Sequence, residues 1–439
     1  MRLPDNVMQC LEALEKAGFA AYAVGGCVRD LYLGLPPQDY DLCTAALPEQ
    51  TAAVFRDHRL VLAGVKHGTV GVVTEDGVVE ITTFRTEGTY ADSRHPDWVE
   101  FVPEVESDLA RRDFTVNAMA WSPRRGFADP FGGREDLKNG ILRTVGEPEK
   151  RFREDPLRIL RGVRFSVRYR LALDPGTERA MGELAPLMQS LARERVFAEL
   201  CGILPRMGAE DLLRFAPVLC AVIPELIPMV GFDQRSPHHA YDLFTHTAKV
   251  LENTPADLVL RWAALLHDTG KIVTFTTDAT GRGHFYGHAK TSAEMADSVL
   301  RRLKAPTQLR EQVVLLIDKH MTHLEPDKKW LKRWISRFGS ETVEDMLLLQ
   351  RADMGSKGTE ENRERDHFDQ IARIIAEIKE ENACLAIRDL AVNGHDLMGL
   401  GITGRDIGQW LQRLLELVLD EKLPNEKEKL LSFVKDAML

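Results

Sequence analysis

The spacing of apolar residues changes near residue 150, and this change restricts the folds open to the chain. Before that point, short apolar runs typical of strands are mixed with helical segments. The strand-like runs lie at 20–24, 40–42, 69–73, 78–83 and 99–102. After it, strand signals almost vanish, and segments such as 155–169, 195–204 and 307–320 carry helical spacing. The sequence therefore predicts an α+β N-terminal part with a small mixed β-sheet, followed by a long all-α body.

Size and charge narrow the class of protein further. A chain of 439 residues exceeds one ordinary core, so we expect roughly two to four domains. The net charge of −10 argues against a protein that coats nucleic acid by bulk charge. The segment 150–170 is nevertheless rich in arginine and contains only Glu154 and Asp155 as acids. This local excess of positive charge indicates a site for a polyanion.

A glycine pair followed by two aspartates is the strongest local motif. Gly25 and Gly26 follow an apolar run and open an expected helix, whose first N–H groups can bind phosphate. Asp39 and Asp41 are two positions apart, so on a strand both carboxylates lie on one face. Two such carboxylates can hold Mg²⁺ together with triphosphate oxygens. Each half alone is more simply a turn or a solvated loop, but their proximity favours a nucleotidyl-transfer site.

Two arginine-containing segments add candidate nucleotide contacts. Arg111 and Arg112 stand beside an acid, and they indicate either a triphosphate site or a surface ion-pair cluster. Asp155 and Arg158 offer a carboxylate acceptor and a guanidinium donor. That pair matches the amine and ring nitrogen that cytosine and adenine share, and it would reject uracil and guanine. In isolation, an i, i+3 salt bridge is the better explanation of Asp155 and Arg158.

These motifs together resemble those of the bacterial class II tRNA nucleotidyltransferase (CCA-adding enzyme) and poly(A) polymerase family. The matching segments are GGCVRD with DYD, RRDFTVNAMA and EDPLRILRGVRF, in that order. A fourth segment, RERVFAEL at 193–200, resembles the helix that braces the nucleotide site. The resemblance is strong over 20–220 and weaker in the tail, at VNGHDLMGLGITGRDIGQWL.

The resemblance implies an enzyme that adds or repairs the 3′-CCA end of tRNA from CTP and ATP, with release of pyrophosphate. Asp39 and Asp41 would be catalytic and hold Mg²⁺. The triphosphate would be held by Gly25, Gly26 and Arg29, with Arg111 or Arg112. A protein template for C and then A would be formed by Glu154, Asp155 and Arg158, with Arg161 and Arg164 contacting phosphate or bracing it.

Family members differ in what they add, and one segment bears on this difference. Residues 83–97 resemble the flexible loop of enzymes that add the full CCA, which enzymes that add only CC lack. The sequence therefore favours full CCA addition. An A-adding enzyme or a poly(A) polymerase remains the alternative.

A further set of residues resembles the metal ligands of the HD phosphohydrolase superfamily. These are His246, the adjacent pair His267 and Asp268, and Asp353. Imidazole and carboxylate together suit Mn²⁺, Ni²⁺, Fe²⁺ or Zn²⁺, and such an ion could activate water against a phosphoester. His288, His320 and His323 could hold a second metal or a phosphate.

Buried histidines are more often simply hydrogen-bonded, which is the plainer interpretation of each residue alone. The rival function is a phosphodiesterase or phosphatase that acts through this set, while the N-terminal part only binds RNA.

The expected domains are a nucleotidyltransferase head at 1–145, a helical neck with the base-recognition helix at 146–235, an HD-type helical domain at 236–360 and a helical tail at 361–439. No apolar run approaches the ~20 residues of a membrane span, and the N-terminus lacks a signal region. Six scattered cysteines without a CxxC motif indicate reduced thiols. We therefore expect a cytoplasmic protein with tRNA, CTP and ATP as partners, no membrane partner and an undetermined oligomeric state.

Overall fold

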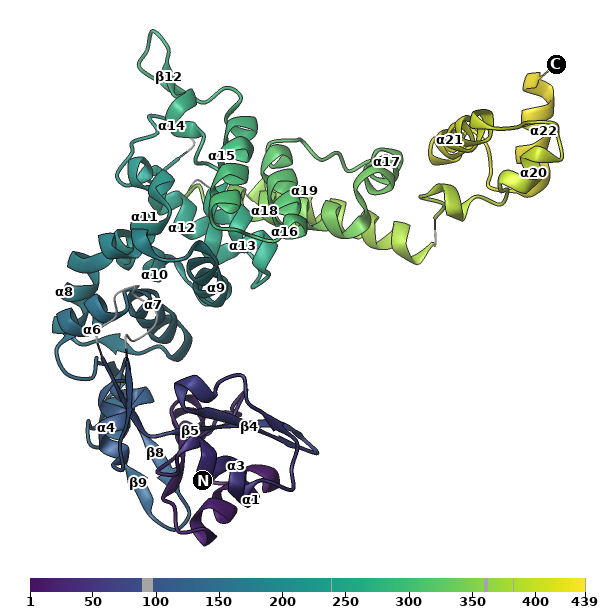
Figure 1. Ribbon diagram of the computed structural model, residues 1–439. Coiled ribbons are helices and arrows are strands. Elements are labelled where there is room, and N and C mark those ends of the chain that lie inside the picture. The colour runs from purple at the N-terminus through teal and green to yellow at the C-terminus, as the bar shows by residue number, and fades with distance from the viewer. Residues whose placement is uncertain (89–97, 238, 359–361, 382, 439) are drawn as a thin grey trace. The chain divides into compact units, whose positions relative to one another are not determined.

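The chain folds into two compact units. The computed structural model describes residues 1–88, 98–237, 239–358, 362–381 and 383–438 (Figure 1). The first unit comprises Met1–Arg206 and Arg214–Pro224, and the second comprises Met207–Leu213 and Glu225–Leu439. The change of unit therefore falls within the segment 146–235 that the sequence assigns to a neck.

The first unit contains a seven-stranded mixed sheet in the order β3-β4-β5-β2-β1-β8-β9. Its strands are β1 (Ala21–Val24), β2 (Asp41–Thr44), β3 (Leu60–Val61), β4 (Thr69–Thr74), β5 (Gly77–Thr83), β8 (Ala120–Ser122) and β9 (Gly126–Ala128). Only β2 and β5 pair in parallel, and the other neighbours are antiparallel. The mixed sheet and the α+β class predicted from the sequence are confirmed.

Helices pack on the sheet and continue beyond it. The early helices are α1 (Asp5–Lys16), α2 (Gly26–Tyr32), α3 (Pro48–Val54), α4 (Val105–Ala110) and α5 (Gly133–Asn139). Figure 1 shows α1 and α3 beside the strands. The helices that follow are α6 (Pro148–Glu154), α7 (Leu157–Tyr169), α8 (Pro175–Leu184), α9 (Arg193–Ile203) and α11 (Ala216–Val222). Short 3-10 turns connect them, of which η2 (Thr115–Asn117) lies next to the site described below.

Four short strands lie outside the main sheet in this unit. The strand expected at 99–102 forms β7 (Val99–Phe101), which pairs with β6 (Arg85–Glu87) in a ribbon of its own. The segment between them includes most of the loop predicted to resemble that of full CCA-adding enzymes, and its residues 89–97 lie outside the described residues. The other pair is β10 (Ile141–Leu142) with β11 (Ala172–Leu173).

One helix expected from the sequence begins two residues later than predicted. The spacing predicts a helix from residue 155, but α6 ends at Glu154 and α7 begins at Leu157. Asp155 is extended, with φ −140° and ψ 101°, because the ring of Pro156 disfavours helical geometry in the residue before it. Asp155 and Arg158 are therefore not on one helix.

The second unit is almost entirely helical, as predicted. Its helices are α10 (Ala209–Arg214, which ends in the first unit), α12 (Leu243–Asn253), α13 (Leu258–Leu266), α14 (Lys271–Thr274), α15 (His288–Arg302), α16 (Thr307–Lys319), α17 (Lys328–Phe338), α18 (Ser340–Gly355), α19 (Asn362–Glu380), α20 (Gly394–Met398), α21 (Arg405–Leu419) and α22 (Lys427–Met438). A small hairpin that the spacing did not predict joins β12 (Thr276–Thr277) and β13 (Gly283–His284).

Two helices, α21 in the tail and α17 before it, carry distinctive residue patterns whose contacts the structure shows. Residues 410–418 on α21 include several apolar side chains. Two of them, Leu414 and Leu415, are buried in a hydrophobic cluster, so this face of the helix is part of the core. Four basic residues of α17 form ion pairs, namely Lys328 with Glu381, Lys329 and Lys332 with Glu421, and Arg333 with Asp420.

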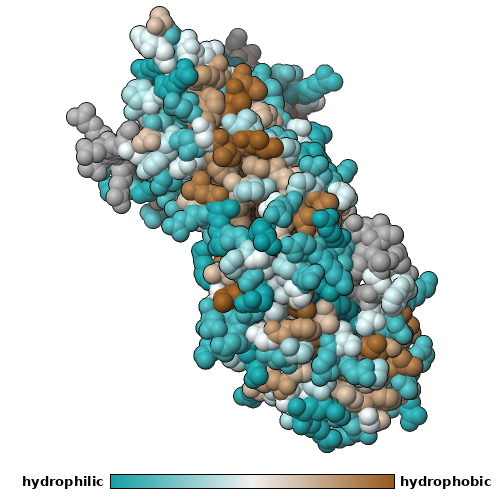
Figure 2. All heavy atoms as spheres, turned by 90° about the vertical axis from the view of Figure 1, so that its left-hand side faces the viewer, coloured by the Kyte–Doolittle hydropathy of each residue, from teal (hydrophilic) through white to brown (hydrophobic). Residues whose placement is uncertain are grey.

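The face drawn in Figure 2 carries hydrophilic residues interspersed with separate apolar patches. None of the helices in the described ranges combines the length and hydropathy that crossing a bilayer requires.

Candidate functional site

The turn between β1 and α2 brings main chain close to an arginine. Gly25 has a φ of +77°, which favours glycine, and its N–H donates to the carbonyl of Met119 on the neighbouring segment. A Cβ at this position would lie 2.7 Å from Nη1 of Arg112. The glycine therefore gives the guanidinium room to lie against the turn, directly before Gly26 opens α2.

The two aspartates lie beside this turn. Asp41 is the first residue of β2, whereas Asp39 precedes the strand, so only one of the pair is on a strand as expected. Burial raises the pKa of Asp41, nearby Asp39 raises it further, and Arg112 lowers it. A carboxylate whose pKa is raised by neighbouring acids is a suitable environment for a divalent cation, because the cation relieves the repulsion.

The structure adds a carboxylate that the sequence analysis missed. Glu80 on β5 is in register with Asp41 on the parallel strand β2, and its charge also raises the pKa of Asp41. Its side chain is exposed, although its neighbours on β5, Val79 and Ile81, are buried. In the sequence, Glu80 is an acid in the middle of an apolar strand, and this position could have marked it as a candidate site residue. Only the strand pairing shows that it lies beside Asp41.

Asp113, the acid next to Arg111 and Arg112, is occupied elsewhere. Its carboxylate accepts hydrogen bonds from Arg161 at 2.7 Å and from the side chain of Asn117 at 3.0 Å. Burial opposes ionisation, but Arg161 and Asn117 outweigh it and lower the pKa of Asp113 to about 2. Asp113 therefore holds α7 against the turn η2 (Thr115–Asn117).

One polar cavity of about 510 Å³ gathers the predicted nucleotide-site residues of the first unit. It is lined, among others, by Gly25, Gly26, Arg29, Asp39, Asp41, Arg111, Arg112, Asp155, Arg158, Arg161 and Arg164. Glu154 is not among its lining residues, but its carboxylate accepts from Arg158 at 2.7 Å. Residues from the glycine turn, from the end of α4 and from α7 thus face one space.

Two arginines at the end of α4 share one buried acid. Arg111 and Arg112 contact the two carboxylate oxygens of Asp108 at 2.8 and 3.4 Å. Burial alone would raise the pKa of Asp108, but the two guanidinium groups lower it below its ordinary value. Asp108 thus fixes both arginines among the residues that line the cavity.

Asp155 and Arg158 are each held in place by another residue. Asp155 accepts from Arg195 of α9 at 2.9 Å and from the main-chain N–H of Leu157 at 3.0 Å. Arg158 donates to Glu154 and, at 3.0 Å, to the carbonyl of Arg111. No ion pair joins Asp155 to Arg158 within the described ranges, so the simple salt bridge considered from the sequence does not form.

Arg29 is almost fully enclosed by its neighbours. Its guanidinium donates to Asp30 at 2.8 Å, to Asn117 and to the hydroxyl of Tyr169. It also lies over the ring of Tyr169, 4.3 Å from the centroid, and only 5% of the residue is exposed. Arg29 therefore ties α2 to η2 and α7 at the wall of the cavity.

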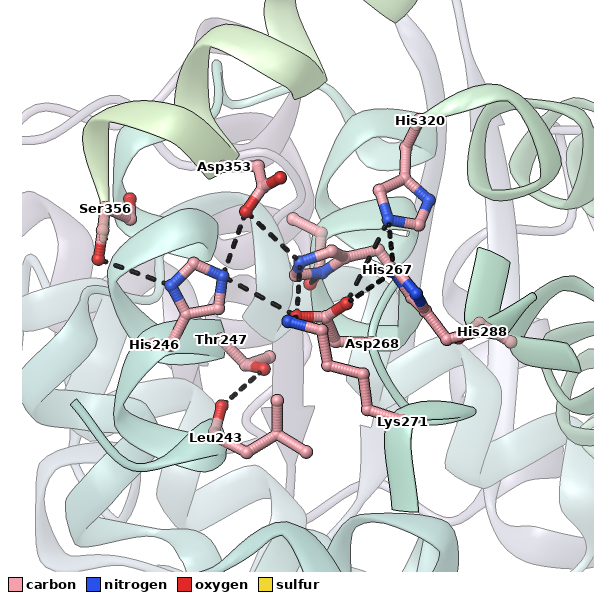
Figure 3. A network of polar contacts seen from close by, with 12 residues as sticks. Leu243, His246, Thr247, His267, Asp268, Lys271, His288, His320, Asp353 and Ser356 are labelled. Carbon is pink, nitrogen blue, oxygen red and sulfur yellow. Dashed lines mark hydrogen bonds and ion pairs between the residues drawn. The ribbon is translucent and has the colours of Figure 1, made fainter. Parts of the chain in front are cut away.

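A second polar cluster lies in the second unit, where His246, His267, Asp268 and Asp353 meet (Figure 3). Nε2 of His246 lies 3.0 Å from Asp353 and 3.6 Å from Asp268. Nε2 of His267 lies 3.2 Å from Asp268. His246 lies on α12, Asp353 lies on α18, and His267 and Asp268 lie in the turn that follows α13; all four are buried.

The hydrogen bonds of the two rings leave their Nε2 atoms facing carboxylates. Nδ1 of His246 lies 3.3 Å from the carbonyl of Ser356, and Nδ1 of His267 lies 2.8 Å from that of Ala264. A carbonyl only accepts, so each Nδ1 carries a proton, and Nε2 is the ring atom left to face the carboxylates and a metal. Nε2 of His267 is buried without a hydrogen bond from any described residue, and Oδ2 of Asp268 has Nζ of Lys271 at 2.8 Å. These donor atoms fit a divalent metal.

Comparison with known proteins covers both units. A model of the "Poly A polymerase head domain" family matches residues 21–143, and one described as "tRNA nucleotidyltransferase domain 2 putative" matches residues 274–434. The curated relatives include proteins named CCA-adding enzyme from Geobacillus stearothermophilus and Streptococcus mutans. The first is 32% identical over 98% of this chain and 96% of its own length, and the second is 34% identical over 99% and 98%.

A solved structure agrees with these matches. A crystal structure described as Bacillus stearothermophilus CCA-adding enzyme in complex with CTP aligns with a TM-score of 0.72 and 29% sequence identity. The alignment covers 100% of this chain and 98% of that one. The similarity therefore extends over the whole sequence.

Proposed function

Because the chain belongs to the CCA-adding enzyme family of tRNA nucleotidyltransferases, we propose that it adds or repairs the 3′-terminal CCA of tRNA. CTP and ATP are the nucleotide substrates, and pyrophosphate is released. The observation that carries this proposal is the cavity of the first unit, where a glycine turn, acidic residues and arginines converge.

The acidic side of the cavity is assigned to catalysis. Asp39 and Asp41, together with Glu80, hold Mg²⁺ in this proposal, because carboxylate oxygens are the ligands that this ion prefers. When bound, Mg²⁺ supplies charge neutralisation for the triphosphate and the leaving pyrophosphate. The protein aligns the 3′-hydroxyl of tRNA with the α-phosphate, and no protein nucleophile is required.

The arginines at the other rim are assigned to the triphosphate. Arg111 and Arg112 contact it while Asp108 fixes their orientation, and Gly25 and Gly26 let the main chain approach it. Arg29 acts by positioning α2 against α7, since its donors already serve Asp30, Asn117 and Tyr169.

The base is selected by Asp155 and Arg158. Asp155 accepts from the exocyclic amine of cytosine or adenine, and Arg158 donates to the adjacent ring nitrogen. Arg195 and Glu154 hold the two groups in place, so the template is built from protein alone. Arg161 and Arg164 brace it through Asp113 and through Glu199 of α9.

A hydrolytic activity at the second cluster is the second candidate function. The buried His246, His267, Asp268 and Asp353 favour it, because their donor atoms converge and the Nε2 atoms of both rings face inward. A bound Mn²⁺, Ni²⁺, Fe²⁺ or Zn²⁺ would supply activated water against a phosphoester.

We assign four parts to the chain in order, namely a head, a neck, an HD-type domain and a tail. We assign the reaction to the cytoplasm, in keeping with the six free thiols.

Extension of tRNA transcripts tests the main proposal. Transcripts ending at the discriminator base, at C and at CC are incubated with Mg²⁺ and CTP, ATP, UTP or GTP. The expected result is ordered addition of two C and one A, and then a stop. Addition of A alone to the CC-ending transcript would identify an A-adding enzyme, and long A tails would identify a poly(A) polymerase.

Two variants separate the candidate functions. Asp41→Ala is expected to abolish incorporation and to leave any phosphoester hydrolysis, whereas His267→Ala is expected to do the reverse. Incorporation that survives Asp41→Ala would overturn the assignment of the head.

A further inference from the structure

We propose that Arg168, near the end of α7, binds the terminal phosphate of the CTP or ATP that enters the cavity of the first unit. This inference rests on the proposed nucleotidyl transfer. It assigns a residue to the end of the cavity that lies farthest from the base-selecting pair, Asp155 and Arg158.

Arg168 differs from the other arginines that line this cavity, because each of the others has an acid within ion-pair distance. The pairs are Arg29 with Asp30, Arg111 and Arg112 with Asp108, Arg158 with Glu154, Arg161 with Asp113, Arg164 with Glu199 and Arg195 with Asp155.

Arg168 forms no hydrogen bond or ion pair with the part of the chain that the structure describes. The centre of its guanidinium lies 5.1 Å from the centroid of the Tyr169 ring. A guanidinium that lines a polar cavity without an acid beside it is suited to bind an anionic group of a ligand, and phosphate is a preferred partner of arginine.

The neighbouring arginines of α7 add to the positive charge at this place. Burial lowers the pKa of the Arg164 guanidinium, and the charges of Arg161 and Arg168 lower it further, whereas Glu199 opposes them. Arg161 and Arg164 each have an acid of their own. A phosphate group beside Arg168 would therefore relieve the repulsion between like charges that the described residues leave.

A series of contacts leads from the base-selecting pair to the glycine turn. Arg158 donates to the carbonyl of Arg111 at 3.0 Å. The next residue, Arg112, lies against the turn, where a Cβ on Gly25 would be 2.7 Å from its Nη1. The arginines assigned to the triphosphate thus lie between the base-selecting pair and the turn.

The series continues along α2 and returns to α7. A Cβ on Gly26 would lie 3.6 Å from Nη2 of Arg29, which donates to the hydroxyl of Tyr169 at 2.5 Å. The same hydroxyl donates to Asp30 at 2.8 Å. Because these bonds fix Tyr169 to α2, the adjacent Arg168 lines the cavity at the end beyond the glycine turn.

The length of α7 agrees with this order. At a rise of about 1.5 Å per residue, Arg168 lies about 15 Å beyond Arg158 along the helix. A base held at Arg158 leaves this distance for the ribose and the three phosphates.

The geometry of the reaction favours the nucleotide over tRNA as the source of the phosphate. In-line displacement places the attacking 3′-hydroxyl of tRNA and the departing pyrophosphate on opposite sides of the α-phosphorus. Pyrophosphate consists of the β- and γ-phosphates, so the far end of the cavity receives the terminal phosphate of the nucleotide.

Nucleotide binding in the absence of tRNA tests the proposal. Isothermal titration calorimetry of the full chain with Mg²⁺ measures the Kd of CTP, of CMP and of pyrophosphate. We expect Arg168→Ala to weaken binding of CTP and pyrophosphate by about tenfold or more, because a charge-assisted hydrogen bond to phosphate is lost, and to leave CMP binding unchanged. Arg168→Gln should behave like Arg168→Ala, whereas Arg168→Lys, which keeps the charge, should restore part of the affinity.

Arg124→Ala is the matched control. Arg124 is an exposed arginine of the same unit, in the turn between β8 and β9, and it is not among the residues that line the cavity. Its substitution removes the same charge from the chain, so it separates a local contact from a general effect of charge. Circular dichroism melts verify that each variant is folded.

The outcomes distinguish the phosphate contact from the proposed reaction. Equal weakening of CTP and CMP binding would overturn the contact, because Arg168 would then act on the part that both nucleotides share. Unchanged CTP binding with a raised KM for tRNA would overturn it in favour of an RNA phosphate. CTP binding that depends on Arg168 in a chain that extends no tRNA would leave the contact and overturn the transfer reaction.

Discussion

At the scale of single residues, the head site depends on which carboxylates face one another. Asp41 has its pKa raised by burial, by Asp39 and by Glu80, which the strand pairing places beside it. Asp113 is adjacent to the arginine motif in the sequence, yet its carboxylate is held by Arg161 and Asn117. Nearness in sequence to the arginine motif is thus a poor guide to which acid lies beside Asp41, and strand register is a better one.

Glu80→Gln tests this assignment. The substitution keeps the size of the side chain and removes its charge. It therefore weakens metal binding and leaves no cavity in the structure. We expect incorporation of both C and A to fall by about 10- to 100-fold, with partial recovery at high Mg²⁺. Single-turnover extension across a Mg²⁺ titration measures the effect, and Asp76→Asn in the turn before β5 is the control. Equal losses in the two variants would remove Glu80 from the site.

At the scale of elements, the break between α6 and α7 sets the positions of the two residues proposed to recognise the base. The spacing of apolar residues predicts a helix from residue 155, and the proline rule explains why Asp155 is extended and the helix begins at Leu157. The resemblance predicts that the segment 193–200 braces the nucleotide site, but it does not identify Arg195 of α9 as the partner of Asp155. The sequence was informative where a motif is local, as in the glycine turn. It did not identify individual contacts between distant elements, such as Glu80 beside Asp41 and Arg195 with Asp155.

Arg195→Ala isolates the contribution of α9 to base selection. Without its ion pair, the carboxylate of Asp155 is free to turn, so its acceptor no longer faces the exocyclic amine. We expect the ratio of CTP to UTP incorporation to fall by about tenfold, which corresponds to about 1.4 kcal/mol of discrimination. Arg193→Ala is the control, because Arg193 bonds only to the carbonyl of Gln189 among the contacts described. Unchanged discrimination in Arg195→Ala would mean that Asp155 is oriented without α9.

At the scale of the whole molecule, two candidate sites lie in two units, each with its own core. A ligand that binds only the folded state slows local opening at its site, by about 2.7 kcal/mol when its concentration is a hundred times Kd. That free energy corresponds to about 100-fold slower amide exchange. Hydrogen exchange followed by mass spectrometry therefore assigns each ligand to a unit.

CTP with Mg²⁺ is expected to protect β1, β2 and α7, and Mn²⁺ in the Asp41→Ala background is expected to protect α12 and α18. His267→Ala should remove the second pattern and keep the first, because it alters no residue of the head cavity. Protection of α12 by CTP and Mg²⁺ in His267→Ala would show that nucleotide binding acts beyond the head. Absence of Mn²⁺ protection at α12 would instead remove His246 from the metal site, since a bound ion would tie that helix to Asp353 on α18.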